Sequence, residues 1–243
     1  MPHRVRRRGP ELSDGAAEEF VRTGTAAGVL PLVPEVVLRV TDDLVALWER
    51  AERRPGAVAG EPPFWAVGWA GGQGLARHVL DHPDLVHGRR VLDLACGSGL
   101  VAIAAALAGG EVTAVDTDPL ALAATQVNAQ ANAVTVRGVC VDLLATSAPT
   151  GPGPAAGWPG DVDVSALEVV LAGDVFYARS MAERVEPFLR AAARAGCTVL
   201  VGDPHRAYLP ATGLELQARY DVEVTPDVEG VTRRCASVFR VLP

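Results

Sequence analysis

The sequence predicts an α/β fold whose central sheet is mostly parallel and ends in an antiparallel hairpin. From Val91 onward, short β-branched runs alternate with alanine-rich helical stretches, as expected for βαβ units. Near the C-terminus, two strand-like runs follow each other with no helix between them, which indicates a hairpin at the sheet edge. No internal repeat and no clear linker divides the 243 residues, so a single domain is expected.

The parallel core is expected to span residues 91–243. Strands are predicted at 91–95, 111–116, 134–141, 168–173 and 198–202, and helices at 100–108, 119–131 and 180–194. The segment 145–160 is so rich in proline, glycine and alanine that an irregular loop is expected. The tail is predicted to contain a helical stretch near 213–219, followed by strands at 220–225 and 233–241.

The first 90 residues have a less regular pattern, and residues 16–90 are expected to form an extension packed on the core. Residues 32–40 alternate like a strand, and Thr41 is suited to cap a helix over 42–53. An aromatic and glycine-rich segment, 62–72, leads into a helix that ends near Pro83. Residues 1–15, which begin with an arginine cluster, are expected to be a disordered basic arm.

Composition excludes several classes of function. A net charge of −7 argues against a nucleic acid partner, and no apolar run reaches the length of a membrane helix. The basic start has no apolar stretch after it, so a secretory signal is not expected. The four cysteines are far apart, which favours reduced thiols in the cytoplasm over a disulfide frame or a zinc site. All 22 basic side chains are arginines, which excludes a Schiff-base lysine and a Walker-type lysine.

The segment 91–99 (VLDLACGSG) is predicted to run from a strand through a glycine turn into a helix. Gly97 and Gly99 permit positive φ, and the helix that follows presents unpaired N–H groups to a ligand. This pattern alone is ambiguous, because Gly97, Gly99 and Ala102 also fit the loose fingerprint of a dinucleotide site.

Acidic residues at the strand ends favour S-adenosylmethionine over a dinucleotide. Asp93 would repel a pyrophosphate but could bind the amino group of S-adenosylmethionine, directly or through water; the alternative is a capping or turn aspartate. Asp116 is placed to accept hydrogen bonds from ribose hydroxyls, whereas Asp118 is expected to cap the next helix, with Pro119 at its first position. Asp142 could accept from the adenine amino group or serve as a plain turn residue.

The segment 173–177 (GDVFY) follows the fourth predicted strand, where ligands bind in sheets of this kind. Methyl transfer needs a neutral nucleophile aligned with the methyl group, and a lysine has an ordinary pKa of about 10.4. Asp174 can therefore bind and orient an amine and help to remove its proton. Phe176 and Tyr177 can flank the developing ammonium, although Phe176 could instead belong to the core.

The segment 63–73 (PFWAVGWAGGQ) is expected to form a wall of the substrate or cofactor site, although Trp65 and Trp69 could also be core residues. If the segment is extended, both tryptophans lie on one face. His78 and His82 are one helical turn apart, but no third ligand is evident. Surface histidines, and not a metal site, are expected there.

Seven motifs occur together in this chain, at 32–35 (LVPE), 63–66 (PFWA), 69–73 (WAGGQ), 91–99 (VLDLACGSG), 115–119 (VDTDP), 173–177 (GDVFY) and 202–204 (GDP). This combination resembles the electron transfer flavoprotein beta-subunit lysine methyltransferases, a family related to the ribosomal-protein lysine methyltransferases. The resemblance implies a Rossmann-like seven-stranded sheet flanked by helices, S-adenosylmethionine as cofactor, and a lysine of a partner protein as acceptor. It also implies cofactor contacts at Asp93, Gly97, Asp116 and Trp69, and a catalytic strand end with Asp174 and Tyr177.

The chain departs from this family at two places. Cys96 stands where serine is common, and a proline-glycine insertion at 150–160 enlarges the rim of the expected site, so the substrate can differ. The candidate catalytic residues are Asp174, Phe176 and Tyr177. The candidate cofactor contacts are Trp69, Gly72, Gln73, Asp93, Ala95, Gly97, Gly99, Asp116, Thr117, Asp142 and Gly173.

Three other functions remain open from the sequence. The acceptor could be a small amine or natural product, or the protein could bind the cofactor without catalysis. A nicotinamide-dependent oxidoreductase could use the same glycine loop, but its tyrosine-lysine pair is impossible without lysine.

Overall fold

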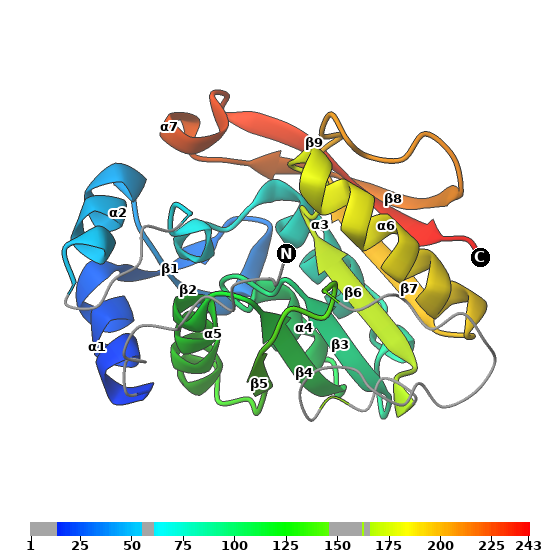
Figure 1. Cartoon of the computed structure of the whole chain (residues 1–243), viewed down its shortest axis with the longest axis horizontal. Coiled ribbons are helices and arrows are strands. Elements are labelled where there is room, and N and C mark those ends of the chain that lie inside the picture. Colours follow the sequence, from blue (N-terminus) through cyan, green and yellow to red (C-terminus); the bar gives the residue numbers. More distant parts are fainter. Residues whose placement is uncertain (1–13, 55–60, 146–161, 163–165) are drawn as a thin grey trace, which may run out of the picture.

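The computed structural model describes residues 14–54, 61–145, 162 and 166–243. Its main sheet contains β3 (Arg90–Leu94), β4 (Glu111–Asp116), β5 (Arg137–Cys140), β6 (Val169–Gly173), β7 (Thr198–Asp203), β8 (Leu214–Glu223) and β9 (Arg233–Val241). The seven strands lie in the order β5-β4-β3-β6-β7-β9-β8 (Figure 1). The first five in this order are parallel, and β9 is antiparallel to both of its neighbours. The predicted fold class is therefore confirmed.

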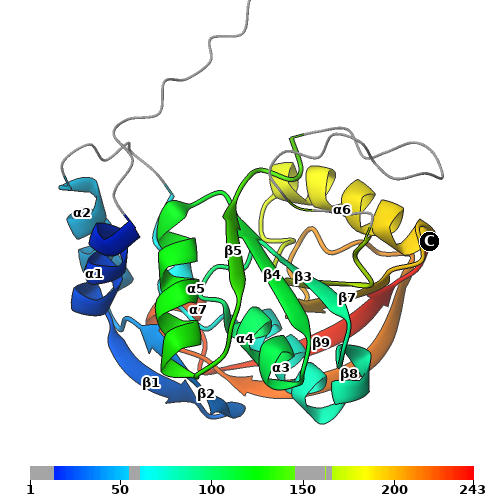
Figure 2. The same ribbon diagram turned by 90° about the horizontal axis from the view of Figure 1, so that it is seen from below.

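Helices cover both faces of this sheet (Figure 2). They are α3 (Ala70–Asp81), α4 (Leu100–Leu107), α5 (Pro119–Ala131) and α6 (Arg179–Arg194), with the short α7 (Pro226–Glu229) between β8 and β9. Successive strand side chains point to opposite faces. Val91 and Val169 pack in the cluster that contains α3 and α4, whereas their neighbours Leu92 and Val170 pack in the cluster that contains α6.

The N-terminal part is joined to the core by polar side chains of α5. It consists of α1 (Asp14–Gly24), the antiparallel pair β1 (Ala26–Leu30) and β2 (Val33–Val40), and α2 (Leu44–Glu52). Asn128 is fully buried; its Oδ1 accepts from the Arg39 N–H at 2.8 Å and its Nδ2 donates to the Ser98 carbonyl at 2.8 Å. Asn132 makes two hydrogen bonds to the backbone of Val37. The hairpin is thus fixed against α5 and the glycine loop.

Several predicted elements differ from the structure. The helical stretch near 213–219 is wrong, because β8 already begins at Leu214 and pairs with β9 along that segment. Asp43, and not Thr41, caps α2 by accepting a hydrogen bond from the Ala46 N–H at 2.8 Å. Strand β5 is shorter than predicted, and α1 and β1 were not predicted. Buried His78 bonds to the Tyr220 hydroxyl at 3.2 Å, so it is not a surface residue.

Two predicted segments fall mainly outside the described residues. They are the basic arm, of which only Asp14 and Gly15 are described, as the start of α1, and the loop at 145–160, of which only Ala145 is described. All four cysteines are free thiols. In the described part of the chain, no helix is long and apolar enough to span a membrane.

Candidate active site

A cavity of about 960 Å³ opens at the carboxyl ends of the parallel strands. This is the place where sheets of this class bind ligands, beside the point at which the strand order reverses. The reversal occurs between β3 and β6. The volume lies within the usual range of small-molecule sites. From the strand ends, its wall includes Ala95, Gly97, Asp116, Thr117, Asp142, Gly173 and Asp174.

The glycine loop after β3 brings backbone to the cavity. Ala95, Gly97 and Gly99 have φ angles of 56°, 52° and 77°. A Cβ on Gly99 would meet the Thr125 side chain at 2.8 Å, so glycine is required for the loop to pack against α5. Ala95 and Gly97 lie on the cavity wall; Gly99 lies behind it as the N-cap of α4 and is not a wall residue.

Asp116 closes β4 and holds the glycine loop. Its Oδ2 accepts from the Gly97 N–H and its Oδ1 from the Asp118 N–H, both at 3.0 Å. Burial raises the pKa of Asp116, and these hydrogen bonds act in the opposite direction. Asp118 caps α5 by accepting from the Leu120 N–H at 2.9 Å, and Pro119 begins that helix, as predicted.

The structure places Asp93 beneath the cavity and not on its wall. The side chain is 2% exposed, and its Oδ2 accepts a hydrogen bond from the Ala102 N–H at 2.9 Å. Ala102 is the third residue of α4, so Asp93 satisfies one of the free N–H groups in the first turn of the helix. The capping alternative is therefore the one observed. Burial raises the pKa of Asp93 to about 8, and the charge of Asp116 acts in the same direction.

This raised pKa predicts that the protein loses stability as the pH rises from the acidic range to about 8. A carboxyl group with a folded-state pKa above its unfolded value stabilises the fold fully only below the unfolded value, and this contribution is lost as the pH rises through about 8. Asp93→Asn removes the ionisation and keeps an oxygen for the Ala102 N–H. We expect the melting temperature of the unmodified protein to fall more steeply than that of the variant between about pH 5 and pH 8. If the melting temperatures of the two proteins changed equally with pH over this range, a buried neutral Asp93 would be contradicted.

Asp142 is on the wall but has a strong partner of its own. Both of its carboxylate oxygens lie 2.7 Å from Nη2 of Arg184, and Oδ1 also accepts from the Leu144 N–H at 3.0 Å. Asp142 is thus a turn residue held by an arginine from α6. Its predicted contact with adenine stays a prediction, and so does the predicted contact of Thr117.

Two glycines let the start of α3 touch the ends of β6 and β7. A Cβ on Gly71 would lie 2.3 Å from the Gly202 carbonyl oxygen and 2.7 Å from Oδ2 of Asp174. This close approach carries the next residue, Gly72, to Asp174, where its N–H donates to Oδ2 at 2.7 Å. Gly72 itself lies behind the wall, while Gly173 forms part of it. The Gly72 N–H thus contacts the Asp174 carboxylate, and the predicted contact of Gly72 with the cofactor stays a prediction.

Asp174 lies at the cavity wall with a φ of 55°, a conformation that aspartate and asparagine tolerate better than most residues. Its Oδ1 accepts two hydrogen bonds from Arg206, at 2.8 Å from Nη2 and 3.1 Å from Nε. Burial raises the pKa of Asp174 to about 6, and the positive charge of Arg206 opposes this rise. At neutral pH the group is therefore mainly a carboxylate.

Three aromatic rings surround this part of the cavity. Phe64 lies 5.7 Å from Trp69 and 6.1 Å from Tyr177, measured between ring centroids, and all three line the wall. The Trp69 indole N–H donates to the Phe64 carbonyl at 2.8 Å. Tyr177 is 46% exposed, so its ring is available to a ligand. Phe64 was not among the predicted site residues.

Three aromatic or polar predictions are corrected by packing. Phe176 is 1% exposed and belongs to the core under α6, so it cannot flank a substrate. The segment that contains Trp65 forms the turn η1 (Phe64–Ala66) instead of a strand. As a result, Trp65 is 2% exposed and packs in the core beside α5, as its core alternative allows, although both Trp65 and Trp69 contribute to the cavity wall. Gln73 is buried and donates to the Gly68 carbonyl at 2.7 Å, away from the main cavity.

Arg206, Glu229 and Arg234 are wall residues that sequence reasoning missed. Arg206 follows β7, and parallel strands place their carboxyl ends at one edge of the sheet. The motif at 202–204 lies at this edge, so it could have been used to predict a site residue just after β7. Glu229 and Arg234 come from the β8–β9 connection and from β9, and no local pattern distinguishes them.

Comparisons with known proteins agree on one class of enzyme. Residues 78–150 match the family model of ribosomal protein L11 methyltransferase (PrmA). Over 190 residues the chain is 36% identical to the electron transfer flavoprotein beta subunit lysine methyltransferase of Xenopus laevis, an alignment that covers 77% of this chain and 70% of that protein. The Danio rerio protein of the same name is 36% identical over 179 residues, which cover 72% of this chain and 62% of the relative.

A solved structure with a similar fold is the 16S rRNA methyltransferase of Thermus thermophilus in complex with S-adenosylmethionine and guanosine. The TM-score is 0.50 at 16% identity, and the match covers 90% of this chain and 50% of that one. At this identity the likeness concerns the fold alone.

Proposed function

Because the chain belongs to the family of electron transfer flavoprotein beta subunit lysine methyltransferases, we propose that it transfers a methyl group from S-adenosylmethionine to a lysine side chain of a partner protein. One observation carries the proposal: the buried carboxylate of Asp174 reaches the cavity at the end of β6, beside Trp69 and Tyr177. This is the arrangement that a cationic amine requires, since it pairs one negative charge with ring faces.

The residues of the β3 and β4 ends fit the cofactor. Asp116 lies at the cavity wall at the end of β4, where its carboxylate can accept a hydrogen bond from a ribose hydroxyl while the Gly97 and Asp118 N–H groups hold it in place. Ala95 and Gly97 offer backbone at the cavity wall, where no large side chain obstructs a nucleoside. When bound, S-adenosylmethionine supplies an electrophilic methyl group on a sulfonium. Asp93 would support this site indirectly, by fixing the start of α4.

Asp174 is the group that can bind the acceptor amine. Lysine is an ammonium at neutral pH and must lose a proton before it can attack. The Asp174 carboxylate can hold the amine by accepting its N–H groups, and it can receive the proton or pass it to water. Its raised pKa, about 6, brings it closer to that of the amine than an ordinary aspartate. The rings of Phe64, Trp69 and Tyr177 border this part of the cavity, and their faces favour the positive charge that the amine gains when the methyl group is transferred.

The charge of the cavity supports a basic acceptor, and the names of the relatives supply a candidate. We propose the electron transfer flavoprotein beta subunit as the partner, on the names of the relatives. The four free cysteines favour a reducing compartment, and we propose the cytoplasm. Acidic side chains outnumber basic ones along the wall: Glu52, Glu61, Asp116, Asp118, Asp142, Asp174 and Glu229 against Arg54, Arg184, Arg206 and Arg234.

The proposal is tested by incubating the purified chain with methyl-labelled S-adenosylmethionine and the electron transfer flavoprotein beta subunit. We expect label in the acceptor protein, and peptide mass spectrometry should assign it to lysine. A beta subunit whose labelled lysine is replaced by arginine serves as the control and should remain unlabelled.

Two results would overturn parts of the proposal. Label that appears only in low-mass material, in a lysate supplied with the same cofactor, would exclude a protein acceptor. Calorimetric titration with S-adenosylhomocysteine and NAD tests the cofactor separately. Binding of NAD without any response to S-adenosylhomocysteine would favour an oxidoreductase and reject methyl transfer.

A further inference from the structure

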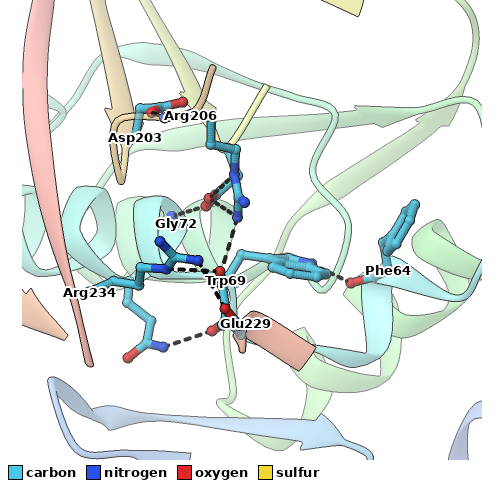
Figure 3. A network of polar contacts seen from close by, with 10 residues as sticks. Phe64, Trp69, Gly72, Asp203, Arg206, Glu229 and Arg234 are labelled. Atoms are coloured by element: carbon cyan, nitrogen blue, oxygen red, sulfur yellow. Dashed lines mark hydrogen bonds and ion pairs between the residues drawn. The ribbon is translucent and has the colours of Figure 1, made fainter. Parts of the chain in front are cut away.

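A chain of alternating charges runs from the catalytic strand end to the β8–β9 connection (Figure 3). It begins at the Gly72 N–H, which donates to Asp174, and continues through Arg206. Arg206 also contacts Oε1 of Glu229 at 3.2 Å, and Oε2 of Glu229 lies 3.3 Å from Nε of Arg234. The side chains of Asp174 and Glu229 are 10% and 4% exposed, so these pairs are screened little by water.

Arg206 occupies the centre of this chain and is fixed from several directions. Its backbone N–H donates to Oδ1 of Asp203 at 2.7 Å, which anchors the residue at the end of β7. Its guanidinium carbon lies 5.4 Å from the Trp69 ring centroid, so the ring borders the cation as Figure 3 shows. Nε and Nη2 of Arg206 both donate to Oδ1 of Asp174, and Nη2 also donates to Oε1 of Glu229.

The contacts of Asp174 are divided between its two oxygens. Arg206 uses Oδ1 and the Gly72 N–H uses Oδ2. An isolated buried carboxyl group could rotate about its Cβ–Cγ bond and would favour the neutral form. With these contacts the carboxylate plane is set. Oδ1 is occupied by two hydrogen bonds from Arg206, whereas Oδ2 accepts one and keeps an acceptor position for a ligand at the cavity wall.

We propose that Arg206 is a positioning residue for methyl transfer, whose guanidinium keeps the Asp174 carboxylate ionised and correctly turned, and that Glu229 holds this guanidinium in place. The proposal rests on the function proposed above for Asp174. It assigns a role to the β8–β9 connection, because α7 contributes Glu229 to a site built otherwise from the parallel strand ends.

The charged and titratable groups around Asp174 come from four further elements. Asp203 at the end of β7 raises the pKa of Asp174, whereas Arg206 lowers it. Glu229 from α7 and Arg234 from β9 act mainly on Arg206 and on each other. Tyr177, after β6, lines the same wall, and α3 contributes only the Gly72 N–H. Arg206 is thus the cation in direct contact with Asp174.

The direct test is the pKa of Asp174, measured by carbon-13 NMR of aspartate carboxyl groups in the full chain, with Asp174→Asn identifying the signal. We expect Arg206→Gln to raise this pKa by about one pH unit or more, the usual effect of removing an adjacent arginine. The acidic limb of kcat/KM should move to higher pH by the same amount, and alkaline pH should restore part of the lost rate. An unchanged Asp174 pKa in this variant would overturn the proposal.

Arg206→Lys separates charge from orientation and also covers the case in which the glutamine variant does not fold. Lysine keeps the positive charge but cannot donate two N–H groups from a rigid fork. We expect a nearly normal Asp174 pKa with kcat reduced about tenfold or more, and wild-type kcat would refute the orienting role. Arg233→Gln, which disrupts an exposed ion pair with Asp221 outside the site, is the matched control and should change neither quantity.

The test distinguishes failure of this inference from failure of the proposed function. The NMR titration needs no turnover, so a protein that methylates no acceptor still reports whether Arg206 controls Asp174. Conversely, an active wild-type enzyme with identical pH profiles for Arg206→Gln and wild type would reject the role of Arg206 alone.

Discussion

Replacement of Asp174 by asparagine is expected to reduce methyl transfer by about 10²- to 10⁴-fold, the usual contribution of a positioned acid-base group. Asparagine has nearly the same shape and tolerates the φ of 55° at this position, so the backbone should not change. It cannot carry the negative charge that holds an ammonium, and it cannot receive a proton. The measurement is the rate of label transfer to the acceptor at saturating cofactor.

The control for this variant is its affinity for S-adenosylhomocysteine, measured by calorimetry. We expect little change, because the residues that fit the cofactor lie at the ends of β3 and β4. A large loss of affinity would mean that Asp174 holds the cofactor instead of the acceptor. A rate within a few-fold of wild type would show that another group orients the amine.

The elements around the glycine loop could be predicted because their signals are local. Gly97 and Gly99 mark a turn that needs positive φ, and both have it. Asp118 and Pro119 mark a helix start by capping chemistry that depends on adjacent residues only. These signals do not depend on distant parts of the chain, and the boundaries that they predict agree with the structure.

Side-chain direction could not be predicted in the same way. Asp93 and Phe176 belong to the correct motifs, but the first points to the N–H of Ala102 and the second into the core under α6. The outcome depends on which helix covers which face of the sheet, and that is a tertiary property. For the same reason, the sequence did not predict Arg206 and Glu229 as site residues. The pairing of β7 with β9 and the position of α7 bring these two side chains together.

For β8 the sequence did carry a signal that was misread. From Leu214 to Tyr220 the apolar and polar residues alternate, a period typical of strands. The structure bears this out, with β8 paired to β9 from Leu214 onward and a bulge between Leu216 and Ala218. The polar side chains of Glu215, Gln217 and Arg219 are exposed along β8, and this polarity resembled that of an exposed helix.

Two buried aspartates share one structural role that links the fold to the site. Asp93 accepts the N–H of the third residue of α4, and Asp174 accepts the N–H of the third residue of α3. Each carboxyl group thus satisfies a free first-turn donor, and the ionised Asp174 also places negative charge at the positive end of a helix. Asp93 is enclosed, so its effect is on stability, while Asp174 reaches the cavity and can also act on a ligand.

The contact between α3 and β7 predicts a large loss of stability for Gly71→Ala. The added Cβ would lie 2.3 Å from the Gly202 carbonyl oxygen and 2.7 Å from Oδ2 of Asp174, and the nearest of these atoms is backbone that cannot move freely. Overpacking of this kind costs typically 1–3 kcal/mol and occasionally more. We expect the free energy of unfolding, measured by urea denaturation, to fall by about 2 kcal/mol. This is the upper part of that cost, since the clash is with backbone, less the offset of at most about 1 kcal/mol from the helix propensity of alanine.

Gly72→Ala, one residue further along the same helix, is the matched control. Its Cβ would meet its nearest neighbours, Oδ2 of Asp174 and Cγ2 of Val101, at 3.9 Å, which is ordinary contact. The free energy of unfolding should stay the same or increase by up to about 1 kcal/mol, since alanine favours a helix over glycine. Equal stability of the two variants would show that α3 can move away from β7 at little cost. The Gly72 N–H would then not be held at Asp174 by packing, and the catalytic strand end would depend on Arg206 for its geometry.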